Sequence, residues 1–410
     1  MIVLRLTPHY YFESGKWPRE FDPLGGMQNQ ISALSEGLNE KNIIQHIITS
    51  GYPGAKQFKK GGLTVYTVSR FWIQIKSKIS GILFFDAFWL CGTIHWLFAN
   101  RKKINKFDLI HHHYSGTYAS IFVFFLMNKL TDVPQVITVH CSKNFTYNPP
   151  NLRSKCMHHI LKYLEIKSFR KAQKVILLTD LHYKDYCTLS KDASKVEVIG
   201  DQIPSYHLKV NEDKIAITKE QFHIRETRFN IAFVGRISFE KGCDFVVQVA
   251  RILNQKTEID FHFWVIGDGP QVDDLKKQVR RLGLEKYVTI TGFVSKLSVP
   301  MLLRNMELLF VPSIHEEFGG IILEGIAANL PIVTSGVGGI KKILGENYIG
   351  IVSNACAEEY AEKIRYFYQN KDEVGYCQKD ILQSYIPYNI NNKVCELYDG
   401  LINKEEMLNA

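Results

Sequence analysis

The chain has 410 residues, 46% of them hydrophobic and 12% aromatic, and a formal net charge of +9. The length predicts two or three domains, of which two is the simplest interpretation, and the composition excludes a disordered chain. The positive charge is compatible with nucleic acid, an anionic membrane surface, a phosphorylated small ligand or an ordinary basic surface, and composition does not choose among these.

The cysteines and the first residues bear on the cellular compartment. The eight cysteines form no Cys-x-x-Cys pair and no zinc-like spacing. The opening MIVLRLTPHYY lacks the basic segment and the long apolar run of a secretion signal. We therefore expect reduced thiols and a cytoplasmic location.

Short apolar runs in the first half predict the strands of a sheet. The first, Val3–Leu6, is followed by Gly25 and Gly26 and then by Gln28–Glu40, whose apolar residues fall at helical spacing. A glycine turn between a strand and a helix can hold a phosphate, and a plain loop is the alternative. The other strands of this half are predicted at Ile43–Thr49, Leu63–Ser69, Asp108–His111, Gln135–Val139, Val175–Thr179 and Val196–Ile199.

The segment Gly81–Ala99 is nearly long enough to span a bilayer and has basic residues on both flanks. Asp86 and His95 interrupt it, and a charge near the centre of a span is costly. We therefore predict a buried or half-buried helix. A helix lying on a membrane surface is the first alternative, and a true span is the second.

Histidines follow two of the predicted strands. His111, His112 and His113 cannot all converge on one ion from an extended segment, because alternate side chains point to opposite faces. We interpret this run as a strand that ends at a cleft, not as a metal site. His140 follows Val139, and ligands gather at the carboxyl ends of parallel strands, so His140 is a candidate functional residue. A hydrogen-bonded structural histidine is the alternative.

Two later stretches are polar. Lys155–Lys174 carries six basic residues against one acid, Glu165, which predicts a solvated basic helix face, with contact to anionic lipid as the alternative. Asp201–Thr218 loses periodicity, so we predict a linker there.

The second half repeats the alternation of strands and helices. Helices are predicted at Asp244–Leu253 and in a polar segment that ends at Arg281. Strands are predicted at Phe229–Val234, Phe261–Ile266, Val288–Thr291, Leu308–Val311 and Ile332–Thr334, and glycine turns follow most of them. The predicted fold class is therefore α/β, with two Rossmann-like domains of doubly wound parallel sheet that face each other across a cleft.

A candidate anion site follows the strand Leu308–Val311. Gly319 and Gly320 stand before a helical segment, where free backbone N–H groups and the helix dipole favour an anion, and Glu316 and Glu324 bracket this turn. Arg236 and Lys241, after another strand, supply two cations, enough to neutralise a diphosphate. Glu324 suits a ribose diol, and Glu316 could accept sugar hydroxyls. Four ordinary surface ions are the alternative.

The chain contains no Asp-x-Asp pair that would hold a divalent metal on a diphosphate. We therefore expect no metal and no cofactor. In such a transfer Arg236, Lys241 and the helix dipole would stabilise the leaving nucleoside diphosphate.

These motifs resemble the retaining family 4 glycosyltransferases of the GT-B fold. The resemblance rests on Gly235-Arg236 with Glu240-Lys241-Gly242, on Gly267-Asp268-Gly269, on Thr291-Gly292-Phe293, and on Glu316 to Glu324 in the pattern E-x-F-G-x-x-x-x-E. It implies a UDP-sugar or other nucleotide-sugar donor in the C-terminal domain and an acceptor in the N-terminal domain.

The same resemblance implies roles for individual residues. Arg236 and Lys241 would hold the diphosphate, Glu324 the ribose, Glu316 with the backbone of Phe318–Gly320 the donor sugar, and His140 would lie near that sugar. It also implies domains at residues 1–205 and 206–387, with a last helix at about 388–410 that packs back on the first. The other donor-binding candidates are the glycines Gly25, Gly26, Gly235 and Gly267 and the aromatic Phe293.

A narrower resemblance spans nearly the whole chain. VLRLTPHYY, Trp17-Pro18, Gly25-Gly26-Met27-Gln28, Thr138 to Ser142 and HEEFGG look like the 2-deoxystreptamine N-acetylglucosaminyltransferases of aminoglycoside antibiotic biosynthesis. This implies transfer of N-acetylglucosamine from UDP-N-acetylglucosamine to a small aminocyclitol. The cationic acceptor would meet carboxylates, for which Glu13, Glu20 and Asp22 are candidates by charge alone.

The sequence departs from the family pattern in two places. Gly200-Asp201-Gln202 stands where most members have Asn-Gly, and Ile340-Lys341-Lys342 stands where Pro-Glu is common. The alternatives to an antibiotic-pathway enzyme are a membrane-surface glycosyltransferase that builds a lipid-linked or envelope glycan and a nucleotide-sugar-binding protein without activity. We expect no nucleic-acid partner, and the sequence does not indicate an oligomeric state.

Overall fold

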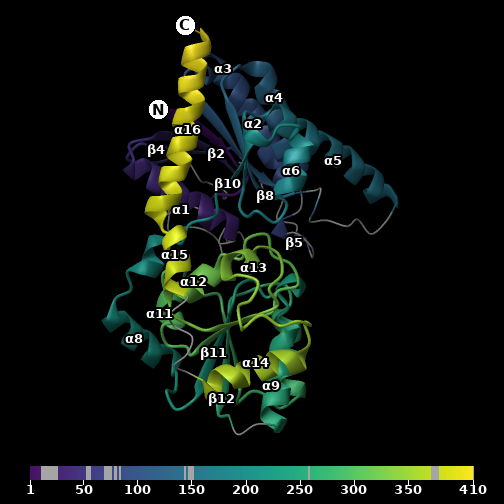
Figure 1. Cartoon of the computed structure of the whole chain (residues 1–410), viewed down its shortest axis with the longest axis vertical. Helices are drawn as coiled ribbons and strands as arrows, with labels where there is room; N and C mark the ends of the chain where they lie inside the picture. Colours follow the sequence, from purple (N-terminus) through teal and green to yellow (C-terminus); the bar gives the residue numbers. More distant parts are fainter. Residues whose placement is uncertain are drawn as a thin grey trace. The chain divides into compact units, whose positions relative to one another are not determined.

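The computed structural model describes residues 1–10, 26–51, 57–68, 76–77, 81–82, 85–142, 145, 152–256, 259–370 and 378–409. The chain forms two compact units (Figure 1). Unit 1 comprises Met1–Gln202 and Pro387–Ala410, and unit 2 comprises Ile203–Ile386. Each is built on a parallel sheet, so the α/β class with two Rossmann-like domains is confirmed.

Unit 1 has a sheet with the strand order β10-β9-β8-β7-β1-β2-β4-β3, in which only β3 runs antiparallel to its neighbour among the described pairs. Strand order reverses at β1, which lies between β2 and β7. The strands of unit 1 are β1 (Ile2–Leu6), β2 (Ile44–Thr49), β3 (Phe58–Lys60), β4 (Leu63–Thr67), β5 (Lys76–Ser77), β6 (Gly81–Ile82), β7 (Leu109–Ser115), β8 (Gln135–Cys141), β9 (Lys174–Leu177) and β10 (Val196–Val198). Its helices are α1 (Gly26–Glu40), α2 (Phe85–Ala99), α3 (Arg101–Ile104), α4 (Tyr118–Leu130), α5 (Leu152–Lys171), α6 (Tyr183–Ser190) and α16 (Pro387–Asn409).

The two faces of β1 differ in chemistry because side chains alternate along a strand. Leu4 and Leu6 pack into an apolar cluster with Trp89 and Leu97 of α2 and with residues of α4. Arg5 points to the other face, where its partners come from α1 and β2. One face of β1 therefore contributes to a large hydrophobic core, and the other holds buried polar groups beside a smaller apolar cluster that includes Ile31 and Ile47.

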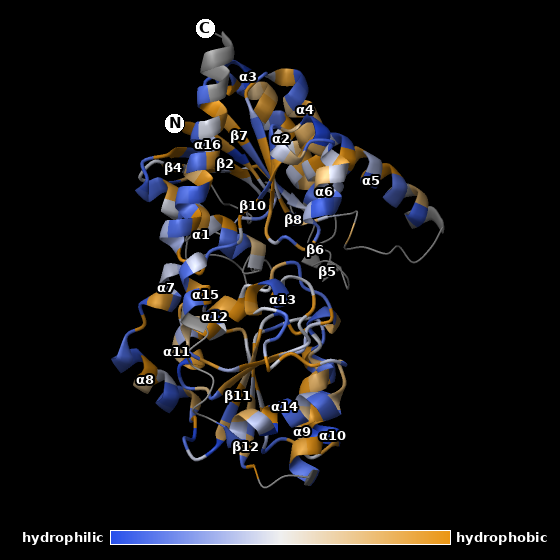
Figure 2. Ribbon diagram, viewed as in Figure 1, coloured by the Kyte–Doolittle hydropathy of each residue, from blue (hydrophilic) through white to orange (hydrophobic). Residues whose placement is uncertain are grey.

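Helix α2 is shorter than the predicted helix, because Gly81–Ile82 forms a strand and the helix begins at Phe85. Trp89 and Leu97 are fully buried in it, while Phe98 is exposed, which agrees with a half-buried helix. Among the described residues, no helix combines the length and the apolar character needed to cross a membrane. Figure 2 shows hydrophobic and hydrophilic residues mixed along α5.

The histidine run is placed differently from the prediction. Strand β7 does not end at His111 but continues to Ser115, and His111, His112 and His113 are all buried inside the sheet. They are tolerated there because each ring has a polar neighbour, such as Gln135 for His112 at 2.8 Å. The predicted strand end was therefore wrong, because β7 ends at Ser115, but His111 and His113 do line a cavity.

Unit 2 has a five-stranded sheet with the order β13-β12-β11-β14-β15, and all of its strands run parallel. Strand order reverses between β11 and β14. The strands are β11 (Phe229–Val234), β12 (Phe261–Ile266), β13 (Val288–Gly292), β14 (Leu308–Val311) and β15 (Ile332–Thr334). The helices are α7 (Ser205–Leu208), α8 (Glu212–Phe222), α9 (Asp244–Lys256), α10 (Val272–Arg281), α11 (Val299–Leu303), α12 (Ile321–Ala327), α13 (Gly339–Leu344), α14 (Ala357–Gln369) and α15 (Gln378–Ser384).

The predicted linker at Asp201–Thr218 was wrong in part, because it contains α7 and most of α8. Helix α8 begins at a cap in which Asn211 accepts a hydrogen bond from Lys214 N, and Thr218 is buried. His207 on α7 is only 3% exposed. The low periodicity reflects short helices that bury single residues.

Gly242 allows two loops of unit 2 to meet. It follows a single 3₁₀ turn (Phe239–Lys241) and has φ +68°, and a Cβ there would lie 2.0 Å from Pro312 O. Ile314 N also donates to Glu240 O at 2.8 Å. The loop after β11 is thereby held against the loop after β14.

We expect Gly242→Ala to destabilise unit 2 more than Gly283→Ala. Gly283 has nearly the same φ, +66°, but no atom within 4 Å of an added Cβ. The control substitution therefore carries only the left-handed strain of about 1–2 kcal/mol, while Gly242→Ala adds overpacking of about 1–3 kcal/mol. Equilibrium urea unfolding measures both, and equal losses would contradict the role given to the Pro312 contact.

Candidate functional site

The candidate site of unit 2 lies where the strand order reverses, at the carboxyl ends of β11 and β14. This is the place where open parallel sheets bind ligands. The loop after β11 carries Gly235, Arg236 and Lys241, and the loop after β14 carries Glu316 and Phe318. The neighbouring strands thus bring together Lys241 and Glu316, which lie 75 residues apart in the sequence.

Lys241 and Glu316 form an ion pair. Lys241 Nζ lies 2.5 Å from Glu316 Oε1, and the same oxygen accepts a hydrogen bond from Ser313 Oγ at 2.9 Å. The Glu316 side chain is 10% exposed and that of Lys241 31% exposed. The pair fixes the carboxylate while leaving the ammonium group open to a second anionic partner. Arg236, on the same loop as Lys241, is exposed.

A third loop, after β15, packs directly against the backbone of Glu316. A Cβ at Gly338 would lie 1.7 Å from Glu316 O, and one at Gly339 would lie 2.5 Å from Glu317 O. Ser335 Oγ also donates to Ser313 O at 2.6 Å. The late Gly-Gly pair therefore shapes the turn that carries Glu316.

Ile340, Lys341 and Lys342 follow these glycines, at the place where Pro-Glu is common in the proteins that the sequence resembles. Ile340 is fully buried, and its Cγ1 would lie 2.8 Å from a Cβ added to Gly319. Lys341 and Lys342 are exposed. The Ile340 side chain therefore packs directly against Gly319.

Phe318, Gly319 and Gly320 precede α12 as predicted. Phe318 is buried, and Gly319 has φ +86°. Helix α12 has only seven residues, and the N–H groups of Ile322 and Leu323 already donate to Gly319 O and Gly320 O. Its dipole is consequently small, and the positive charge of the site comes mainly from Lys241 and Arg236.

Glu324 lies in the first turn of α12, with its side chain 25% exposed. Its Oε2 is 3.5 Å from His207 Nε2, on α7. Burial raises the pKa of Glu324 to about 7 and lowers the pKa of His207 to about 3, so the imidazole is neutral. His207 was not predicted as a site residue, because a single histidine in a polar stretch of sequence does not indicate a site.

The remaining unit 2 candidates lie at strand ends. Gly235 follows β11 with φ +142°, and Gly267 follows β12 with φ +146°. A Cβ on Gly267 would lie 1.9 Å from Gly235 O, so these turns are in direct contact. Phe293, just after β13, is 46% exposed. Their roles toward a ligand stay predictions.

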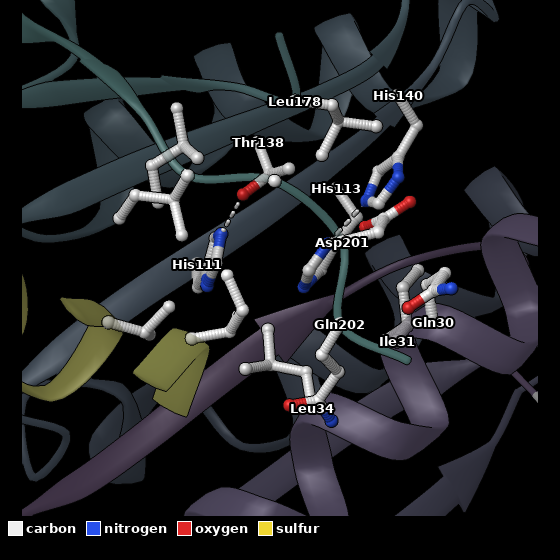
Figure 3. A pocket seen from close by; sticks show the side chains of 15 residues that line it. Gln30, Ile31, Leu34, His111, His113, Thr138, His140, Leu178, Asp201 and Gln202 are labelled. Atoms are coloured by element: carbon white, nitrogen blue, oxygen red, sulfur yellow. Dashed lines mark hydrogen bonds between the residues drawn. The ribbon is translucent and has the colours of Figure 1, made fainter. Parts of the chain in front are cut away.

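In unit 1, His140 is the sixth residue of β8, and Gly26 begins α1. His140 lines a cavity of about 30 Å³ together with His113, Gln30, Asp201 and Gln202 (Figure 3). Burial, with smaller contributions from Arg5 and His9, lowers the pKa of His140 to about 3. The candidates Gly25, Glu13, Glu20 and Asp22 lie outside the described residues.

Asp201 and Gln202 stand where the family has Asn-Gly. Burial raises the pKa of Asp201 to about 7, and Gln202 is 3% exposed with no hydrogen-bond partner for its Oε1. Across the residues that the structure covers, no cluster of three or more His, Cys, Asp or Glu side chains converges on a metal position. The expectation that no metal is needed stays a prediction.

The two units match two family models and several known proteins. Residues 24–201 match the model described as Glycosyltransferase Family 4, and residues 214–381 the model described as Glycosyl transferases group 1. The chain is 35% identical over 345 residues to a 2-deoxystreptamine N-acetyl-D-glucosaminyltransferase of Niallia circulans. The aligned region covers 82% of this chain and 88% of that protein.

A more distant relative and a solved structure extend this likeness. The chain is 28% identical over 330 residues to a 2-deoxystreptamine glucosyltransferase of Streptomyces kanamyceticus, with 78% and 83% of the two chains covered. The structure of Anabaena Alr3699/HepE in complex with UDP and glucose has a TM-score of 0.69 at 16% identity, with 98% of this chain and 100% of that chain covered. This second likeness shows the fold alone.

We expect Glu324→Gln to stabilise the protein at high pH and not at low pH. The pKa of Glu324 is about 7 in the folded protein against 4.5 in the reference state. A carboxyl group whose pKa is raised in the folded protein does not lower the stability at pH values below its unfolded pKa, where it is protonated in both states. Its ionisation lowers the stability progressively as the pH rises from the unfolded pKa to the folded pKa. The gain should therefore grow between these two values and reach about 2–4 kcal/mol above pH 7.

Thermal unfolding of wild type and Glu324→Gln from pH 5 to pH 8.5 measures this gain. Glu346→Gln removes an exposed carboxyl group of the same unit and serves as the control. A pH-independent difference between wild type and Glu324→Gln would show that the carboxyl group is ionised throughout this range.

Proposed function

Because the chain belongs to the family 4 glycosyltransferases of the GT-B fold, we propose that it transfers N-acetylglucosamine from UDP-N-acetylglucosamine to 2-deoxystreptamine, with retention of anomeric configuration. The observation that carries the proposal is the 35% identity over 82% of the chain to an enzyme named for this donor sugar and acceptor. The second relative is named as a glucosyltransferase of the same acceptor, so the proposed acceptor has more support than the proposed donor sugar. The pathway would then be aminoglycoside antibiotic biosynthesis.

Unit 2 has the groups that a nucleotide-sugar donor needs. Arg236 and Lys241 lie on one loop at the switch point of the sheet, where they would neutralise the diphosphate. When the bond to the sugar breaks, charge develops on the leaving UDP, and fixed cations stabilise it more than they stabilise the bound donor. This supports a transfer that needs no metal. Binding of UDP and glucose by the HepE neighbour is consistent with this assignment.

Glu316 and Glu324 would contact different parts of the donor. Glu316, held by Lys241 and Ser313, presents a carboxylate that can accept hydrogen bonds from sugar hydroxyls. Glu324, on the helix that follows, would accept from the ribose diol when ionised. Because its pKa is about 7, we infer that donor binding strengthens as this group loses its proton.

The acceptor would meet unit 1. A diaminocyclitol carries positive charge at neutral pH and is attracted by carboxylates, for which Glu13, Glu20 and Asp22 remain the proposed candidates. His140 would contact the donor sugar from unit 1.

We expect the purified protein to convert 2-deoxystreptamine and UDP-N-acetylglucosamine to a product heavier by one N-acetylhexosamine, detected by mass spectrometry without detergent or lipid. UDP-glucose and other UDP-sugars complete the panel. A product formed with UDP-glucose alone would identify UDP-glucose as the donor in place of UDP-N-acetylglucosamine. No product with any UDP-sugar would contradict 2-deoxystreptamine as the acceptor. Transfer that appears only with a lipid acceptor would support the membrane-surface alternative.

Arg236→Ala and Lys241→Ala should each lower kcat by about 100-fold or more, because each removes charge stabilisation of the leaving UDP. Lys276→Ala, which removes an exposed lysine of α10, serves as the control and should leave kcat unchanged. Full activity in Arg236→Ala or Lys241→Ala would contradict the role given to that residue.

A further inference from the structure

Arg5 is a cation buried in the interior of unit 1. It lies on β1, is fully buried, and its described hydrogen bonds all go to uncharged groups. Its Nη1 donates to Ser35 Oγ at 2.5 Å and to Gln45 Oε1 at 3.1 Å. Its Nε and Nη2 lie 3.2 and 2.8 Å from His113 Nε2. Within the part of the chain that the structure describes, no carboxylate hydrogen-bonds to Arg5, and a buried charge without an opposite charge is costly.

The contacts of Arg5 determine where the protons of two histidines lie. A guanidinium group has donors and no acceptor, so His113 Nε2 must accept. A neutral His113 then carries its proton on Nδ1, which lies 3.0 Å from His140 Nε2 (Figure 3). His113 donates along this contact, and His140 Nε2 accepts. A neutral His140 therefore keeps its own proton on Nδ1.

Both histidines are neutral at neutral pH. Burial lowers the pKa of His113 well below its usual value, and His111 and Arg5 lower it further. The pKa of His140 falls to about 3, with burial as the main cause and Arg5 and His9 as the next. Asp201 lines the same cavity as both histidines.

We propose that Arg5 is a positioning residue which, through His113, fixes His140 as the Nδ1–H tautomer. His140 then offers a ligand a hydrogen-bond donor at Nδ1 and cannot take a proton there as a general base. The ligand group it suits is an oxygen acceptor, such as a sugar hydroxyl or a phosphate oxygen. Only this last step rests on the proposed function, because the proton positions follow from unit 1 alone.

The test is ¹⁵N NMR of the full chain labelled at histidine, recorded at neutral pH. In the wild type, His140 should show a protonated Nδ1 and an unprotonated Nε2. His113→Gln keeps an oxygen that accepts from Arg5 and an amide that donates to His140, so the Nδ1–H tautomer should persist. His113→Met has a similar volume and removes the donor, so His140 should show a mixture of tautomers.

Arg5 is tested by a second matched pair. Arg5→Lys keeps a donor toward His113 and should keep the tautomer, while Arg5→Met should lose it and raise the pKa of His140. If Arg5→Met does not fold, the His113 pair and the wild-type spectrum decide. An Nε2–H or doubly protonated His140 in the wild type, or a single Nδ1–H tautomer in His113→Met, would overturn the proposal.

Transfer kinetics separate this inference from the proposed function. His113→Met should lower kcat by about tenfold through loss of one oriented hydrogen bond, and His113→Gln should restore most of it. Correct tautomers in a protein that transfers no sugar would remove the proposed function and leave the role of Arg5 intact. Transfer of the sugar by a protein whose His140 is not the Nδ1–H tautomer would support the proposed function and contradict the role given to Arg5.

Discussion

Backbone contact between three loops of unit 2 is the constraint on which the rest of its site depends. Glycines at 242, 338 and 339 let the loops after β11, β14 and β15 approach without intervening side chains. Lys241 and Glu316 consequently meet although 75 residues separate them. These contacts hold the backbones of the three loops together, and the carboxylate of Glu316 is then held in place by Lys241 and Ser313.

The two units handle positive charge in opposite ways. Unit 2 places Arg236 and Lys241 on a loop, where water and ligand can reach them. Unit 1 encloses Arg5 among Ser35, Gln45 and His113, where it acts through hydrogen bonds. Nearby histidines stay neutral as a result, since burial and the neighbouring cation both oppose a second charge. The first arrangement suits binding of an anion, and the second suits orientation of a neutral side chain.

The sequence predicted the strands of unit 2 because each apolar run is followed by glycine or proline within two residues, and four of the five match to the residue. It also identified the loops that carry Arg236, Lys241 and Glu316. It failed where tertiary contacts decide. The burial of His111–His113 depends on partners such as Gln135, the helices in the predicted linker depend on packing in unit 2, and the neighbours of Arg5 depend on the strand order β7-β1-β2.

Helix α16 belongs to unit 1 although the whole of unit 2 precedes it in the chain. Tyr398 on this helix contacts His111 Nδ1 at 2.5 Å, and Asn391 occupies the space that a side chain at position 37 of α1 would need. During synthesis, all of unit 2 is made before α16, so unit 1 lacks its last helix until the end of the chain is made. The contacts that α16 makes with β7 and with α1 can therefore form only after the whole of unit 2 has been synthesised.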